Sequence, residues 1–170
     1  LIESGANRPG LTPGRLLRSL KSSLATGYEG TDIFGRYYTL EALIALYLRT
    51  LRERAEAEVG QPVESVVLGR PVTFVGSGDG GRGERAANRR AEDRLRQAAH
   101  MAGFHQVTFE FEPVAAALHY ELTAQHPQNV VVFDFGGGTL DMTVMRVGGL
   151  AGRRVFATGG VGIAGDVFDQ

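Results

Sequence analysis

Residues 130–141 read VVVFDFGGGTLD, and this stretch decides the fold of the chain. The apolar run 130–133 predicts a buried strand that ends at Asp134. Glycines 136–138 then predict a turn, and residues 139–147 predict a second strand with Asp141 near its start. We therefore expect a hairpin with one carboxylate on each side of a glycine-rich turn.

The turn has the composition of an anion site. Successive glycines let backbone N–H groups point into one concavity without interference from side chains. A carboxylate such as Asp134 would repel a bare phosphate, so the pattern favours a phosphate that shares a hydrated Mg²⁺ with it. The Thr139 hydroxyl can contact phosphate or orient water. The alternative is a plain hairpin, although three glycines exceed what a tight turn requires.

A second glycine-rich stretch, residues 76–81, reads GSGDGG. P-loops and dinucleotide fingerprints both lead from their glycines into a helix, whereas the 136–138 turn leads into a strand, and the chain contains no GxxxxGK[ST] pattern. The 76–81 stretch precedes an arginine-rich helix and has no partner acid at the expected distance. We interpret it as a surface loop.

Outward from the hairpin, hydrophobic periodicity predicts helices and strands in alternation. The predicted helices run from Thr12-Pro13 to Leu24 and over 39–60, 88–102 and 112–122. The predicted strands cover 63–68, 72–75, 107–111, 130–135, 139–147 and 153–158, and 27–35 and 76–87 are predicted loops. Alternating helices and strands followed by an antiparallel meander indicate an α/β fold.

Composition excludes several classes of protein. The chain has 170 residues, 43% hydrophobic and 22% charged, with a formal net charge of -1 and no cysteine. We therefore expect no disulfide, no thiolate metal site, no nucleic acid partner and no membrane segment, and a cytoplasmic location. The arginines of 82–96 alternate with acids, and the four histidines lack metal-ligand spacing. The first residue is Leu1, so we expect an internal piece of a longer protein.

The motifs resemble one family in family order. FDFGGGTLD at 133–141 resembles the second phosphate-binding hairpin of the actin-like ATPases in the form found in DnaK-type heat-shock protein 70 chaperones. FEPVAAAL at 111–118 resembles that family's strand-to-helix segment, and GRPV, AAHMAGF and GDVFD, which start at residues 69, 98 and 165, are similar to further elements of it. GRP and the stretch RSLKS at 18–22 look closest to the divergent YegD-like branch.

The resemblance implies a partial actin-like ATPase (ribonuclease H-like) fold. It divides the chain into an outer helical part of lobe I at 1–62, the second half of the lobe I core at 63–128, and the start of lobe II at 129–170. It implies ATP or ADP and Mg²⁺ as cofactors.

The resemblance also assigns roles to single residues. The amides of Gly136, Gly137, Gly138 and Thr139 would hold the phosphates. Asp134 would anchor Mg²⁺ with Glu112 in its outer shell, and Pro113 could relay the nucleotide state. Thr139 or Asp141 would orient the attacking water, and Lys21, by segment order, would stabilise the transferred phosphoryl group. Lys21 is the only lysine in the chain, which favours a site that needs a compact charge.

Departures from the family leave alternatives open. Gly160 stands where the family commonly has aspartate and Ala164 where it has glycine, so either could weaken the site. The family's first phosphate loop and its adenine-binding lobe lie outside the chain, so we expect the isolated piece to be inactive and able to dimerise through exposed surfaces. Unfolded clients and co-chaperones would bind only through missing parts. Two other functions stay open: a sugar or small-molecule kinase of the same fold, and a nucleotide-sensing scaffold without turnover.

Overall fold

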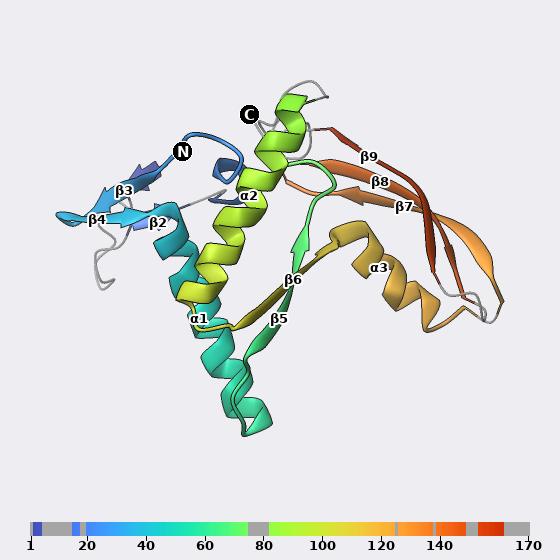
Figure 1. The fold of residues 1–170 in the computed structure, drawn as a ribbon, viewed down its shortest axis with the longest axis horizontal. Helices are drawn as coiled ribbons and strands as arrows, with labels where there is room; N and C mark the ends of the chain where they lie inside the picture. The colour runs from blue at the N-terminus through green and yellow to red at the C-terminus, as the bar shows by residue number, and fades with distance from the viewer. Residues whose placement is uncertain are drawn as a thin grey trace.

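The structure is a computed structural model that describes residues 2–4, 15–17, 20–74, 82–124, 126–137, 139–148 and 153–161. It is a mixed α/β arrangement of small sheets with flanking helices (Figure 1), which confirms the predicted fold class. The elements in chain order are β1 (Ile2–Ser4), β2 (Arg15–Leu17), the 3-10 helix η1 (Leu20–Ser23), β3 (Gly30–Ile33), β4 (Arg36–Thr39), α1 (Leu40–Val59), β5 (Ser65–Arg70), α2 (Arg82–Met101), β6 (Gln106–Phe111), α3 (Glu112–Glu121), β7 (Gln128–Phe135), β8 (Leu140–Val147) and β9 (Arg154–Val161).

The N-terminal part differs from the predicted helix between Thr12 and Leu24. Among the described residues of this segment, Arg15–Leu17 form strand β2, which pairs antiparallel with β1, and Leu20–Ser23 form a 3-10 turn, so the helix prediction was wrong for these residues. Thr12 and Pro13 lie outside the described residues. Helical spacing of leucines is a local signal, whereas the pairing of 15–17 with 2–4 is decided by a more distant segment of chain.

The predicted loop at 27–35 contains a strand instead. β3 and β4 form a hairpin whose turn places Phe34 at φ 50° and Gly35 at φ 79°. Phe34 is a non-glycine residue in the left-handed region, and its side chain is 76% exposed. Because the tight turn contains only one glycine, the sequence signal for it was weak.

Helix α1 begins and ends where its capping residues predict. Thr39 is the N-cap, and its hydroxyl accepts a hydrogen bond from the Ala42 amide at 3.1 Å. Gly60 ends the helix in the left-handed conformation at φ 73°, with its amide bonded to the Glu56 carbonyl. Leu40, Leu43, Ala45 and Leu48 of this helix are buried.

Strands β5 and β6 pair in parallel, and α2 makes the crossover between them. Helices α1 and α2 lie side by side against this pair (Figure 1). Small residues let the two helices approach closely, and the core that they share with the strands consists of Ala45, Leu48, Ala98, Ala99, Ala102, Phe104 and Val107. Helix α2 begins at Arg82, earlier than the predicted residue 88.

The predicted strand at 72–75 is not formed by residues 72–74, and Val75 lies outside the described residues. The amide of Val72 donates to the Asp141 carboxylate at 3.1 Å, and that of Phe74 donates to the Asn88 side chain at 3.0 Å. Side chains accept the hydrogen bonds of these two amides, so the segment satisfies these donors without pairing to a strand.

The predicted meander is confirmed as an antiparallel sheet in the order β7-β8-β9. Helix α3 covers one face of it, and the core between them contains Val114, Ala117, Met145 and Val147. Burial alternates along β7 and β8, as expected for a sheet covered on one face.

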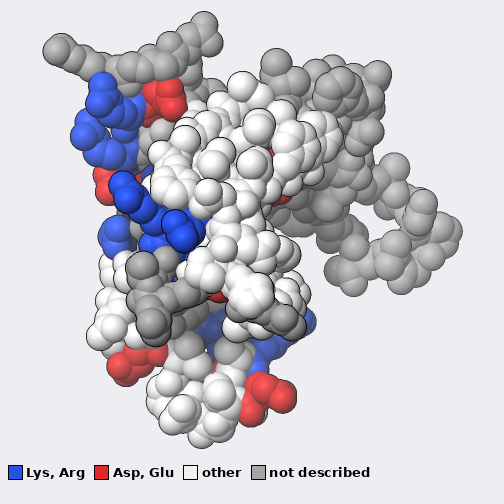
Figure 2. All heavy atoms as spheres, turned by 90° about the vertical axis from the view of Figure 1, so that its right-hand side faces the viewer, with Lys and Arg blue, Asp and Glu red and all other residues white. Residues whose placement is uncertain are grey.

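The other face of the meander is exposed and apolar. Its exposed side chains include Val131, Phe133, Phe135 and Met142, of which Phe133 is 61% exposed. Figure 2 looks at this side of the molecule, where uncharged atoms fill the centre of the view. Across the described ranges, no helix is both long and apolar enough to cross a membrane.

Candidate functional site

The hairpin of β7 and β8 places two carboxylates opposite each other. Asp134 and Asp141 are direct cross-strand partners, so their side chains leave the sheet on the same face, the face that α3 covers farther along. The Gly136 amide donates to the Thr139 carbonyl at 3.0 Å and closes the turn. Gly137 is exposed, and Gly138 lies outside the described residues.

Asp141 is almost completely buried, with 1% of its surface exposed. Its Oδ1 accepts the hydrogen bond from Val72, whereas its Oδ2 has no hydrogen-bond partner among the described residues. Burial raises the pKa of Asp141, and the negative charge of Glu112 acts in the same direction. The Thr139 hydroxyl and the amides of Val72 and Thr73 oppose that rise without cancelling it.

Lys21 meets Glu112 although 91 residues separate them in the chain. The Lys21 Nζ lies 2.6 Å from Glu112 Oε1, and the two side chains are 51% and 31% exposed. Glu112 is in the first turn of α3, followed by the buried Pro113, and its side chain passes over Gly69 of β5. A Cβ at position 69 would lie 3.2 Å from Glu112 Cγ, so a side chain there would crowd the glutamate.

These contacts place five of the predicted residues around the turn end of the hairpin. Lys21 contacts Glu112, and Asp141 feels both the charge of Glu112 and the hydroxyl of Thr139. Asp134 completes the group as the cross-strand partner of Asp141. Sequence reasoning named each of these residues but could not show that they meet.

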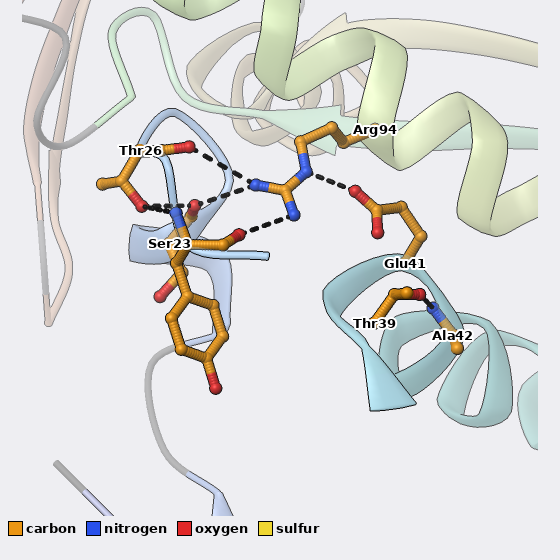
Figure 3. A network of polar contacts seen from close by, with 7 residues as sticks. Ser23, Thr26, Thr39, Glu41, Ala42 and Arg94 are labelled. Carbon is orange, nitrogen blue, oxygen red and sulfur yellow. Dashed lines mark hydrogen bonds and ion pairs between the residues drawn. The ribbon is translucent and has the colours of Figure 1, made fainter. Parts of the chain in front are cut away.

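Arg94 of α2 was not predicted, yet it determines where the chain carrying Lys21 lies. Its guanidinium donates to the carbonyls of Ser23, Thr26 and Tyr28 at 3.4, 3.5 and 2.8 Å (Figure 3). It also forms an ion pair with Glu41 in the first turn of α1, and both side chains are 14% exposed. Burial by itself would raise the pKa of Glu41, but the hydrogen bond and charge of Arg94 lower it overall.

An open pocket of about 460 Å³ adjoins this network. None of the predicted site residues lines it. Its lining residues are Thr26, Gly27, Tyr28, Glu29, Tyr37, Thr39, Glu41, Arg90 and Arg94. The pocket is therefore separate from the carboxylate pair at the hairpin.

Comparison with protein families decides the relationship. The family model described as Hsp70 protein matches residues 22–170, most of the chain. The chain belongs to the Hsp70 family. Members of this family are ATP-binding chaperones, so the mixed α/β structure is part of an Hsp70 actin-like nucleotide-binding domain. The match begins at the residue that follows Lys21 and includes Glu112 and the whole hairpin.

For this member of the Hsp70 family, the carboxylates at the hairpin fit a hydrated metal ion better than a protein-only metal cage. Within the ranges that the structure describes, no three His, Asp or Glu side chains form a group that could hold a metal by themselves. Mg²⁺ commonly takes one or two carboxylates and completes its shell with waters and phosphate. Asp134, which is partly exposed, and Glu112, which is 31% exposed, offer this number of carboxylates, whereas Asp141 is buried.

In this Hsp70 chain, the packing around position 160 of β9 explains why a glycine stands there, which the sequence did not reveal. Gly160 pairs with Asp141 across β8 and β9, and a Cβ on it would overlap Asp141 Oδ1. The neighbouring Gly159 has no atom within 4 Å of such a Cβ. The buried carboxylate therefore occupies the space that a side chain at 160 would need. Ala164 lies outside the described residues.

Proposed function

We propose that this chain forms part of the ATP-hydrolysing site of an Hsp70-type chaperone, with the phosphates bound at the β7–β8 turn. The observation that carries the proposal is the convergence of Lys21, Glu112 and Asp141 at the turn end of this hairpin. A cation and two acids from η1, α3 and β8 meet beside a glycine turn, which is the composition expected for phosphoryl transfer. Within the family, the stretches GRP and RSLKS support placing the chain in the divergent YegD-like branch.

The phosphates would contact backbone amides of the turn. In the present conformation the Gly136 amide is bonded to the Thr139 carbonyl, so we place the anion against the amides of Gly137, Gly138 and Thr139. Gly136 then contributes by closing the turn and by leaving the approach free of a side chain. Backbone donors held in this way stabilise negative charge without needing to reorganise.

A hydrated Mg²⁺ would be held by Asp134, with Glu112 in its outer shell. The negative charge of Glu112 already acts on Asp141, and a cation among these acids and a phosphate would relieve that repulsion. When bound, Mg²⁺ neutralises charge on the phosphate oxygens. Asp141, whose pKa burial raises, would share with Thr139 the orientation of the attacking water.

Lys21 would supply the positive charge closest to the transferred phosphoryl group. Its side chain is half-exposed and is held by Glu112, so it is accessible to a nucleotide and already oriented toward the site. A compact ammonium with rotatable donors suits one phosphate oxygen better than the planar fork of arginine does. Clients and co-chaperones would act through other parts of the protein, in the cytoplasm, and protein folding under stress is the implied role.

The test is Lys21→Ala in the protein that carries this chain together with its further domains. We expect ATP hydrolysis to fall on the order of 100-fold or more while ATP binding is retained, because the lysine acts mainly on the transition state. Arg89→Ala is the control, since Arg89 is an exposed cation on α2. Hydrolysis is followed by phosphate release and binding by calorimetry.

Two outcomes would contradict parts of this proposal. Hydrolysis at the wild-type rate in Lys21→Ala would remove Lys21 from the site. A wild-type protein that binds ATP without measurable turnover, unchanged by the substitution, would favour a nucleotide-sensing scaffold. For the isolated 170-residue chain we expect no tight binding of magnesium-ATP, and calorimetry that measures tight binding would overturn that expectation.

A further inference from the structure

Residues 71–74, here called the strap, directly follow β5. The amide of Val72 holds Asp141 Oδ1 at 3.1 Å, and the strap is the segment that reaches the hairpin from β5. The strap is fixed to α2 by two further bonds, from the Phe74 amide to Asn88 and from the Thr73 hydroxyl to Glu84, each at 3.0 Å. Any movement of the strap therefore changes the environment of Asp141.

Arg70, the last residue of β5, folds its side chain back over the strap. Its Nε donates to the Pro71 carbonyl and its Nη2 to the Val72 carbonyl, both at 2.9 Å. Its Nη1 forms an ion pair with Glu92 of α2. The guanidinium thus engages both carbonyls that flank the Val72 amide, which orients that amide toward Asp141.

Aromatic rings complete the enclosure of Arg70. The guanidinium carbon lies 5.4 Å from the ring centroid of Phe74 and 5.0 Å from that of Phe111, and only 12% of the side chain is exposed. Burial lowers the pKa of Arg70, and the charge of Asp141 opposes this shift, so the two groups sense each other. A desolvated guanidinium destabilises a fold unless its hydrogen bonds are satisfied, and here strap carbonyls and Glu92 accept them.

We propose that Arg70 is a positioning residue of the candidate site: it holds the strap so that the Val72 amide stays bonded to Asp141. The effect of Arg70 on hydrolysis rests on the proposed function, but its control of the bond between Val72 and Asp141 does not. A nucleotide-dependent change on the α2 side would reach Asp141 through the same route, from Glu92 to Arg70 to Val72.

A double-mutant cycle read at the Val72 amide tests this coupling. The amide proton and nitrogen shifts of Val72 are measured by NMR in the 170-residue chain, in Arg70→Gln, in Asp141→Ala and in the double variant. Deleting the Asp141 acceptor should move the Val72 amide proton upfield in the wild-type background. In the Arg70→Gln background the same deletion should move it little, because the bond is already lost.

Matched variants separate positioning from charge and from general loss of packing. Arg96→Gln removes a guanidinium that also lies over a ring, Phe109 at 4.9 Å, and also donates to a carbonyl, that of Val107 at 2.8 Å. It should leave the response of Val72 to Asp141→Ala intact. Arg70→Lys keeps the positive charge but not the planar guanidinium that bonds both carbonyls, so it should behave like Arg70→Gln. It takes the place of Arg70→Gln in the cycle if that variant does not fold.

The inference is overturned if Asp141→Ala shifts the Val72 amide equally in the presence and absence of Arg70. In the longer protein, Arg70→Lys should lower kcat while KM for ATP changes little, because the strap is bonded to Asp141, which is proposed to orient the attacking water and not to hold the phosphates. The hydrolysis assay of Lys21→Ala tests the proposed function, and the NMR cycle tests only the effect of Arg70 on the bond between Val72 and Asp141. A failure of one is therefore distinguishable from a failure of the other.

Discussion

At the scale of single residues, the buried carboxylate of Asp141 fills space that a neighbouring side chain would otherwise occupy. Its Oδ1 is held by the Val72 amide, and its Oδ2 lacks a partner among the described residues. Because the residue is 1% exposed, solvent cannot compensate for a displaced contact. Gly160, directly across the strand pair, is therefore constrained more by Asp141 than by the conformation of β9.

Gly160→Ala should destabilise the chain by about 1–3 kcal/mol, because the new methyl group would overlap Asp141 Oδ1 and force it to move. Gly159→Ala is the matched control, since it adds the same methyl group to the same strand where no atom lies within 4 Å. Urea denaturation measures both. Equal transition midpoints for the two variants would show that Asp141 does not occupy the space described.

At the scale of elements, η1, α1 and α2 are joined through Arg94. One guanidinium contacts the carbonyl of Ser23 in η1, two carbonyls of the segment after it and the first-turn carboxylate of α1 (Figure 3). The residue that holds the backbone following Lys21 therefore lies on α2, remote from Lys21 in the sequence. Breaking this junction should release η1 without directly altering the hairpin of β7 and β8.

Glu41→Gln should lower the free energy of unfolding at pH 7 by about 1–3 kcal/mol, because it removes a charge-assisted bond to Arg94. The pKa of Glu41 is lowered in the folded state, so its contribution to stability is complete above the ordinary glutamate pKa and is lost as the pH falls through the folded value. The difference between wild type and variant should therefore shrink in acid.

Urea denaturation from pH 7 to pH 3 measures this trend. Glu53→Gln, on the exposed side of the same helix, is the control and should change stability by only a few tenths of a kcal/mol at any of these pH values. A Glu41→Gln deficit that persists undiminished at pH 3 would mean that Arg94 does not depend on the charge of Glu41.

At the scale of the whole molecule, the described residues form separate cores. One lies between α1, α2 and the parallel strands, and another lies between α3 and the meander. No residue belongs to both, and polar contacts such as Lys21–Glu112 and Val72–Asp141 join the two parts. Half-exposed ion pairs contribute little to stability, so we expect the two parts to open separately.

Met145→Ala should reveal this separation. Met145 is fully buried between α3 and the meander, and its truncation should lower the opening free energy of β7 and β8 by about 2–5 kcal/mol. Native-state hydrogen exchange should show little change in α1 and α2, whose core does not include Met145. An equal loss of protection in α1 and β8 would instead show a single cooperative unit.

The sequence by itself determined the features whose cause is local. Thr39 and Gly60 set the ends of α1, Glu112-Pro113 started α3, and an apolar run followed by three glycines and a second strand predicted the hairpin within 130–147. What only the tertiary structure decided were hydrogen bonds whose partners lie far along the chain. Residues 15–17 became a strand because 2–4 pair with them, and residues 72–74 did not, because the side chains of Asp141 and Asn88 take the amides of Val72 and Phe74. The meeting of Lys21 with Glu112 has the same origin: no pattern within a few residues of either one encodes a contact across 91 positions.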